Sequence, residues 1–195
     1  KNCNDIFNLF EDERFTSILI GPGCGLNQTT KDVVRKALGQ EKPVVLDADA
    51  LTVFKDCRAD LIGAEKACTL VLTPHEGEFS RLFKGKGDKL GRCRTAAEVS
   101  DAVILLKGYD TVIANPNAET IINNNAPANL ATAGAGDVLS GLIAGLLAQG
   151  MDPFLSAAAA VWLHGKAAAG FGMGLIASDI PELIPNVLIE LYEGT

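Results

Sequence analysis

Short, unbroken apolar segments, each followed by a turn-forming or charged residue, constrain the fold of this chain more than any other feature of its sequence. Four of them occupy residues 17–20, 43–46, 69–72 and 102–106. Unbroken apolar runs are typical of strands buried on both faces, and the polar or helical stretches between them suit crossover connections. We therefore predict that these four segments form a parallel sheet.

Two further apolar segments, 111–114 and 119–122, are separated by the turn signal Asn115-Pro116-Asn117. This spacing predicts an antiparallel hairpin. The sequence thus predicts an α/β fold with a mainly parallel central sheet, flanking helices and an antiparallel hairpin at its edge. No second domain boundary is visible, so we expect one domain over residues 1–195.

The last third of the chain predicts three consecutive helices. Apolar residues recur at helical spacing from Val138 until Gly150 offers a C-cap. Asp152 and Pro153 then suit the start of a second helix, and a third follows from residue 179. The second helix is rich in alanine and contains His164, which we expect to be a packed or capping histidine.

Composition narrows the class of protein and its partners. The 195 residues are 48% hydrophobic, enough for one globular domain with a substantial core. A net charge of −7 argues against nucleic acid and anionic membranes as main partners. No apolar run reaches the roughly 18 residues of a membrane span, and no signal peptide is visible.

The cysteines are scattered, form no CxxC pair and predict reduced thiols in a cytoplasmic protein; they are Cys3, Cys24, Cys57, Cys68 and Cys93. Two histidines are too few for a histidine-rich metal centre. The chain begins at Lys1 instead of a methionine. We therefore expect that an upstream portion is missing.

The segment with the strongest chemical signal is Gly134-Ala135-Gly136-Asp137, which leads directly into an apolar helix. Glycines ahead of a helix leave its first N–H groups uncovered, and the helix dipole favours negative charge there. This pattern predicts a phosphate-binding anion hole. The alternative is that Asp137 caps the helix and the glycines form a tight turn.

Other polar groups follow the predicted strands. A glycine loop at 21–25 comes after the first strand, and Asp47 and Asp49 come after the second. The carboxyl ends of parallel strands bind ligands, so the loop suits a ligand and the two acids suit Mg²⁺ or a ligand hydroxyl. A tight turn, one N-cap and one solvated acid are the alternatives.

The third strand is followed by Thr73-Pro74-His75-Glu76-Gly77-Glu78, and the fourth by Lys107-Gly108. His75 and the two glutamates are expected to share the ligand-binding edge, although the glutamates also suit the N-terminus of a helix. Lys107 is expected to reach a nucleotide phosphate. A solvated lysine in a strand connection is the alternative.

Taken in order, these segments resemble the ATP- or ADP-dependent NAD(P)H-hydrate dehydratases of the ribokinase-like superfamily. The resemblance extends over nearly the whole chain and is carried by residues 21–25, 47–51, 73–78, 107–108, 130–150 and 159–165. It implies repair of hydrated nicotinamide cofactors. ATP or ADP phosphorylates the 6-hydroxyl of the S form of NADH or NADPH hydrate, and loss of phosphate restores the cofactor.

The resemblance also implies residue roles. Asp137 would be the catalytic base, and Gly134, Ala135 and Gly136 would supply backbone donors. The residues that would bind the hydrate are Gly23, Gly25, His75, Glu78 and Asp137. The nucleotide would be bound by Lys107, Gly108, Tyr109, Asp110, Thr111 and Gly136. Mg²⁺ is expected to accompany the nucleotide, with its ligands unknown.

This chain departs from the family pattern at three places. Cys24 stands where the family often has leucine, Ala135 where it often has serine or threonine, and residues 126–129 differ from the usual Gly-Asn-Pro-Gly. Family members also carry a glycine- and alanine-rich segment and at least one strand ahead of residue 17. The chain is therefore expected to be an N-terminally truncated domain. In a longer protein, an epimerase domain could precede it.

The resemblance implies NADH or NADPH hydrate and an adenine nucleotide as partners, and we also expect a homo-oligomer. Two other functions share much of the pattern. One is a ribokinase-like kinase that phosphorylates a vitamin or sugar, and the other is a non-catalytic nucleotide-binding domain. A product assay and replacement of Asp137 distinguish the three.

Overall fold

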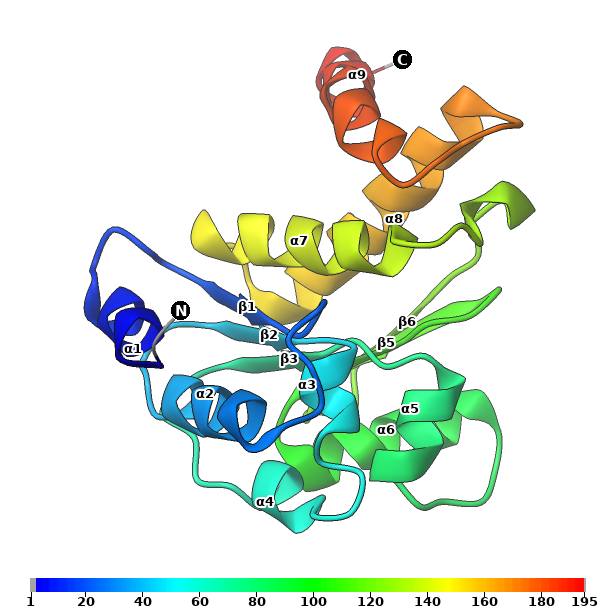
Figure 1. The fold of residues 1–195 in the computed structure, drawn as a ribbon. Coiled ribbons are helices and arrows are strands. Elements are labelled where there is room, and N and C mark those ends of the chain that lie inside the picture. The colour runs from blue at the N-terminus through cyan, green and yellow to red at the C-terminus, as the bar shows by residue number, and fades with distance from the viewer. Residues whose placement is uncertain (1–2, 195) are drawn as a thin grey trace.

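The computed structural model describes residues 3–194, with side-chain surroundings from Ile6 onward. Its centre is a six-stranded sheet whose strands lie side by side in sequence order (Figure 1). The first four strands pair in parallel, and the last two run as an antiparallel hairpin. Both predictions are therefore confirmed. The strands are β1 (Ile18–Ile20), β2 (Val44–Leu46), β3 (Leu70–Leu72), β4 (Val103–Leu106), β5 (Thr111–Ala114) and β6 (Thr120–Asn123).

Helices cover both faces of the sheet and give the molecule three layers (Figure 1). One face carries α2 (Gln28–Leu38), α3 (Asp49–Thr52), α4 (Ala59–Ile62), α5 (Glu76–Leu82) and α6 (Lys89–Ser100). The other face carries α7 (Ala135–Ala148) and α8 (Pro153–Phe171). At the periphery, α1 (Cys3–Glu11) packs on α2, while α9 (Asp179–Glu193) packs on α8 and lies away from the sheet.

Each parallel strand contributes to two cores, because successive side chains point to opposite faces of the sheet. The side chains that face α2, α3, α5 and α6 are buried, and they include Val44, Leu46, Leu70, Leu72, Ile104 and Leu106. Those that pack under α7 and α8 are equally buried, and they include Val45, Val71, Val103 and Leu105. This double burial explains why the sequence of these strands is unbroken in apolar residues.

The three C-terminal helices occur in the predicted order, with one shifted boundary. The Asp152 side chain accepts the Leu155 N–H at 3.0 Å, and Pro153 is the first residue of α8, as expected. The start of α7 differs, because the helix begins at Ala135 and not after Asp137. Asp137 therefore lies inside the first turn of α7.

No helix in the described part of the chain is both long and apolar enough to cross a membrane. Four of the cysteines are free thiols, namely Cys24, Cys57, Cys68 and Cys93. The side chain of Cys3 lies outside the described residues. Burial raises the pKa of Cys93 to about 12, so that this thiol stays protonated at neutral pH.

Candidate active site

The loops that follow β1, β2, β3 and β4 carry most of the residues singled out in the sequence. In open parallel sheets this carboxyl edge is where ligands bind. Direct contacts join the loops: the Lys107 N–H donates to the Pro74 carbonyl at 2.9 Å, and the Thr73 N–H donates to Leu46 at 3.1 Å. The segments after β2, β3 and β4 therefore form one continuous surface.

The start of α7 is open. Gly134, the residue ahead of the helix, has a φ of +85°, a left-handed conformation that favours glycine. Among the described residues, no side chain caps α7. The Asp137 side chain is exposed and has no hydrogen-bond partner among residues 3–194. The interpretation of Asp137 as a helix cap is therefore wrong, and its carboxylate is available for other chemistry.

The backbone donors at this helix end differ from those expected. The Ala135 N–H donates to the Thr132 carbonyl at 3.2 Å, because the chain turns tightly before the helix. The expectation of a free donor at Ala135 is thus corrected for this structure. The N–H groups of Gly136 and Asp137 have no acceptor in the described part of the chain. Together with the positive end of the helix dipole, they offer an anion two adjacent donors.

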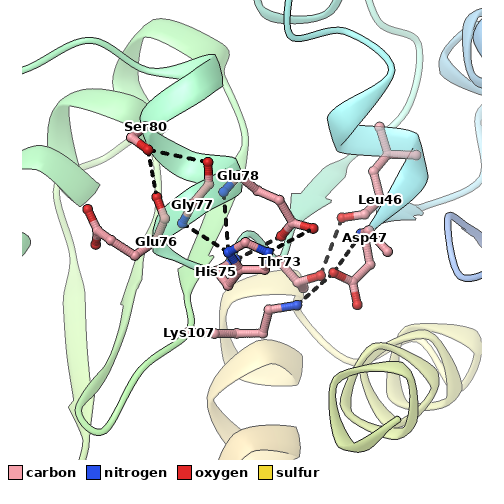
Figure 2. A network of polar contacts seen from close by, with 10 residues as sticks. Leu46, Asp47, Thr73, His75, Glu76, Gly77, Glu78, Ser80 and Lys107 are labelled. Atoms are coloured by element: carbon pink, nitrogen blue, oxygen red, sulfur yellow. Dashed lines mark hydrogen bonds and ion pairs between the residues drawn. The ribbon is translucent and has the colours of Figure 1, made fainter. Parts of the chain in front are cut away.

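Lys107 lies beside this open end. Its Nζ is 2.7 Å from Oδ1 of Asp47 (Figure 2). A Cβ placed on Gly136 would lie 3.4 Å from the same Nζ. Asp47 is only 1% exposed and also accepts the Ala48 N–H at 2.8 Å. Neither a solvated lysine nor an open metal ligand is present here. Instead, a buried carboxylate holds an ammonium group next to the start of α7.

The glycine loop after β1 is fixed by the loop after β2. A Cβ on Gly21 would lie 1.8 Å from the Asp47 carbonyl oxygen, so only glycine allows this approach. The Gly25 N–H donates to Oδ2 of Asp49 at 2.8 Å, and the Thr30 hydroxyl donates to the Gly25 carbonyl at 2.7 Å. Asp49 is thus neither solvated nor a helix cap. It shapes the loop, leaving Gly23 exposed.

His75 and Glu78 form a capping box at the start of α5 (Figure 2). Nδ1 of His75 accepts the N–H groups of Gly77 at 2.9 Å and Glu78 at 3.3 Å. In return, the Glu78 carboxylate accepts a hydrogen bond from the backbone N–H of His75 at 2.9 Å, and Glu78 is almost fully buried. The His75 side chain remains 55% exposed, so it can serve as a cap and still meet a ligand.

A cavity of about 580 Å³ lies next to Lys107 and the start of α7. Seven sequence-predicted residues line it: His75, Lys107, Gly108, Tyr109, Thr111, Ala135 and Gly136. Its remaining walls are mostly apolar, formed by residues of 126–131 together with Leu139, Val161 and His164. The cavity lining therefore combines charged and apolar residues.

The remaining predicted residues lie outside that lining, and they are Gly23, Gly25, Glu78, Asp110, Gly134 and Asp137. Asp110 points to Lys89, whose Nζ is 3.0 Å from its Oδ1, and this hydrogen bond lowers the pKa of Asp110. Lys89 also donates to the backbone carbonyl of Asp110, so this residue is held by Lys89 outside the cavity lining. Asp137 and the glycine loop belong to the exposed surface beside the cavity.

His164 is a cavity residue that was predicted only to pack or to cap a helix. It is 4% exposed, and burial lowers its pKa to about 4. Its Nε2 has no hydrogen-bond partner in the described part of the chain. A usable signal in the sequence is the surrounding alanine-rich helix, because small neighbours allow the close packing that buries an imidazole.

Within residues 3–194, no group of three or more His, Cys, Asp or Glu side chains could hold a metal ion. The two acids proposed for Mg²⁺ are engaged, Asp47 with Lys107 and Asp49 with Gly25. Mg²⁺ commonly binds phosphate oxygens and waters with one or two carboxylates. The residues at this edge therefore fit a magnesium ion held mainly by a phosphate ligand and water.

The chain matches a known protein family over almost its whole length. The profile of the NAD(P)H-hydrate dehydratase family matches residues 3–185. A bifunctional NAD(P)H-hydrate repair enzyme of Salinibacter ruber is 40% identical over 185 residues, which are 90% of this chain and 34% of that protein. An ADP-dependent (S)-NAD(P)H-hydrate dehydratase of Neisseria meningitidis serogroup B is 40% identical over 81% of this chain and 58% of its own length.

A solved structure supports the same grouping. An ADP/ATP-dependent NAD(P)H-hydrate dehydratase from Bacillus subtilis, co-crystallised with ATP/Mg²⁺ and soaked with CoA, superposes with a TM-score of 0.80 at 31% identity. The match covers 90% of this chain and 66% of that one. A ribokinase-like superfamily protein of Enterococcus faecalis superposes with a TM-score of 0.82 at 28% identity, over 96% of this chain and 66% of that one, so the predicted ribokinase-like fold class is confirmed. The chain spans 34% and 58% of the two curated relatives described above.

Proposed function

The chain belongs to the NAD(P)H-hydrate dehydratase family, and on that basis we propose that it dehydrates the S form of NADH or NADPH hydrate with ADP or ATP as phosphoryl donor. The observation that carries the proposal is the open start of α7. There the free N–H groups of Gly136 and Asp137, the exposed Asp137 carboxylate and the Lys107 ammonium lie together.

The proposed reaction has two steps. Asp137 takes the proton of the 6-hydroxyl while the hydroxyl oxygen attacks the terminal phosphoryl group, which breaks its bond to the rest of the nucleotide. Loss of phosphate from the ring, with a proton from the neighbouring carbon, then restores the double bond of NADH or NADPH. ADP becomes AMP and ATP becomes ADP.

The groups around Asp137 suit the charge that develops in the first step. Phosphoryl transfer depends mainly on positioning and on electrostatic stabilisation of the transferred group. The amides of Gly136 and Asp137 are fixed donors at the positive end of a helix, and Lys107 is held in place by buried Asp47. Donors that need no rearrangement stabilise a transition state better than mobile ones.

Substrate and nucleotide are assigned to adjoining regions. The cavity with Lys107, Gly108, Tyr109, Thr111 and Gly136 is proposed to hold the nucleotide. The surface with Gly23, Gly25, His75 and Glu78 is proposed to hold the hydrate. A bound Mg²⁺ would supply further positive charge beside the phosphates. Asp110, which Lys89 holds outside the cavity lining, is assigned no contact of its own, and Gly134 would supply the turn that opens the helix. The expected cytoplasmic location and homo-oligomeric state stay predictions.

The test is to mix the purified chain with the S-hydrate of NADH and either nucleotide. Recovery of NADH absorbance, with one AMP or ADP and one phosphate formed per NADH, is the expected result. Absence of recovery with both nucleotides contradicts the proposal. Accumulation of a stable phosphorylated product would instead identify a kinase.

Replacement of Asp137 is the matched control, because Asp137→Asn keeps the size of the side chain and removes the base. We expect turnover to fall by roughly 100-fold or more while nucleotide affinity, measured by calorimetry, changes little. Unchanged turnover in this variant would remove Asp137 from the proposed mechanism. A protein that acts only as a nucleotide-binding domain would be insensitive to the substitution.

A further inference from the structure

A second cavity lies away from the candidate active site. It is formed by α4, α5, α6 and the connection between α5 and α6, on the face of the sheet opposite α7 and α8 (Figure 1). Its volume is about 390 Å³, a size that suits a small molecule. It shares no lining residue with the cavity beside Lys107. The function proposed above therefore leaves this second cavity without a role.

The charged residues that line this cavity all have the same sign. They are Arg58, Lys84, Lys86 and Arg92, and no aspartate or glutamate of the described chain belongs to the lining. The whole chain, by contrast, has 24 acidic and 17 basic residues and a net charge of −7. A cleft lined by charges of one sign concentrates the potential inside it. The lining therefore favours an anion.

Three of these four cations are not neutralised by a neighbour. Arg92 donates to the two carboxylate oxygens of Glu76, at 2.5 and 3.1 Å. The side chains of Arg58, Lys84 and Lys86, however, make no hydrogen bond or ion pair with residues 6–194. Charged groups bind carboxylates and phosphates most strongly when they are not already paired. These three side chains are therefore available to a ligand.

The rest of the lining is largely apolar. Phe79 and Leu82 of α5 are each 1% exposed, and Ala96 of α6 is 2% exposed, so this part of the lining belongs to the packed core. Val99 of α6 also lines the cavity but is 55% exposed. A ligand that covers apolar surface of this kind gains binding free energy from its removal from water. The lining thus suits a ligand that carries an apolar group as well as a charge.

We propose that this cavity binds a small organic anion, with a carboxylate or phosphate ester next to an apolar group. Arg58, Lys84 and Lys86 bind the anionic group, and the apolar residues of α5 and α6 contact the remainder. A bare inorganic anion would leave the apolar lining uncovered, so it binds more weakly. The proposal is independent of the proposed function, because the two cavities are lined by different residues.

Two dyes that differ in charge test the proposal. Anilinonaphthalene sulfonate is an aromatic anion whose fluorescence rises in an apolar site, and N-phenylnaphthylamine has the same rings without the sulfonate. The wild type should bind the sulfonate more tightly than the neutral amine. This difference should shrink as the salt concentration rises, because salt screens exposed charges.

The variant that tests the cavity is Lys84→Gln/Lys86→Gln. It should bind the sulfonate roughly fivefold more weakly and the neutral amine as the wild type does, because exposed charge pairs contribute modestly. The control Lys36→Gln/Lys166→Gln makes the same change in charge on α2 and α8, outside this lining, and should stay within about twofold of the wild type. All four lysines are exposed, so thermal denaturation should show folded proteins.

Competition defines the ligand class. Phenylpropionate and phenyl phosphate should displace the sulfonate dye, and the one that acts at the lower concentration identifies the preferred anion as a carboxylate or a phosphate ester. Inorganic phosphate should require a much higher concentration. ADP should leave the dye bound, since it is assigned to the other cavity.

Four results would overturn the proposal. Equal sulfonate affinity in the wild type and Lys84→Gln/Lys86→Gln removes the cationic contacts. An equal loss for the neutral amine shows that the substitutions act on the shape of the cavity and not on an anion. Displacement by neither phenyl compound excludes the ligand class, and complete displacement by ADP locates the dye in the candidate active site. None of these measurements uses the hydrate, so failure of the proposed function leaves them unchanged.

Discussion

At the scale of single residues, burial changes what a side chain can do. His164 and Cys93 are both buried, and burial keeps each of them neutral: it lowers the pKa of the imidazole to about 4 and raises that of the thiol to about 12. Asp137, in the first turn of α7, and Cys24, in the glycine loop after β1, are exposed instead. Residue type alone does not distinguish these environments.

The depressed pKa of His164 predicts a dependence of stability on pH. In the unfolded chain the imidazole binds a proton below about pH 6.5, whereas in the folded protein it does so only below about 4. The stabilisation of the folded state by neutral His164 is therefore fully present above pH 6.5 and is lost as the pH falls to about 4. We expect this fall in pH to lower the free energy of unfolding by roughly 3 kcal/mol.

Urea denaturation of the wild type and His164→Gln at several pH values between 4.5 and 7 measures this effect. The variant should lose most of the pH dependence in that window, because glutamine does not titrate. If the free energy of unfolding changes with pH equally in both proteins, carboxylates and not His164 cause the pH dependence.

At the scale of elements, the start of α7 depends on one backbone conformation. Gly134 has a φ of +85°, and a Cβ there would lie 3.2 Å from the Cβ of Ala177. We expect Gly134→Ala to destabilise the protein by about 1–2 kcal/mol. Gly145→Ala is the control in the same helix, because nothing lies within 4 Å of its Cβ position and alanine favours a helix; it should stabilise by about 0.5–1 kcal/mol.

Chemical denaturation measures both glycine variants, and phosphate affinity gives a second readout. The Gly134 variant should also bind pyrophosphate more weakly, since the strained turn moves the N–H groups of Gly136 and Asp137. A Gly134→Ala protein as stable as Gly145→Ala would show that the turn does not need its left-handed conformation.

The cap of α5 allows the structural and ligand-binding roles of His75 to be separated. Asparagine is a good N-cap residue and alanine is a poor one. His75→Asn should therefore stay close to the wild type in stability, whereas His75→Ala should lose about 1 kcal/mol. If the imidazole binds the hydrate, both variants should raise KM for it. A normal KM in His75→Asn would leave His75 with the capping role alone.

At the scale of the whole molecule, the pair of Lys107 and Asp47 joins the ends of β4 and β2 across β3. Asp47 is 1% exposed, so removing its partner leaves a buried charge without compensation. We expect Lys107→Met to destabilise the protein by about 3 kcal/mol. Adding Asp47→Asn should recover much of that loss, because the buried group is then neutral.

Denaturation curves of the two single variants and the double variant give the coupling between these residues. Additive effects would mean that the pair contributes little, despite the 2.7 Å separation of its atoms. Nucleotide affinity should stay low in the double variant even where stability recovers, because the ammonium beside Gly136 is still absent.

Much of the fold could be predicted from the sequence because its signals are local. Unbroken apolar strands, the Asn115-Pro116-Asn117 turn and the Asp152-Pro153 helix start depend on neighbours along the chain, and each lies where it was predicted. The boundary of α7 was less predictable. Gly134 and Ala135 are weak markers, since glycine suits a turn, a cap and a helix start alike.

The sequence by itself determined the layered α/β architecture and the set of chemical groups at the strand ends, because these follow from local periodicity and from the shared direction of parallel strands. Only the tertiary structure decided their states. It paired Asp47 with Lys107 and used the Ala135 N–H in a turn. Among the described residues, it gave the Asp137 carboxylate no partner and buried His164 with one ring nitrogen unpaired. The reason is physical: burial and pairing depend on groups far apart in the chain, and sequence spacing does not encode the distance between them.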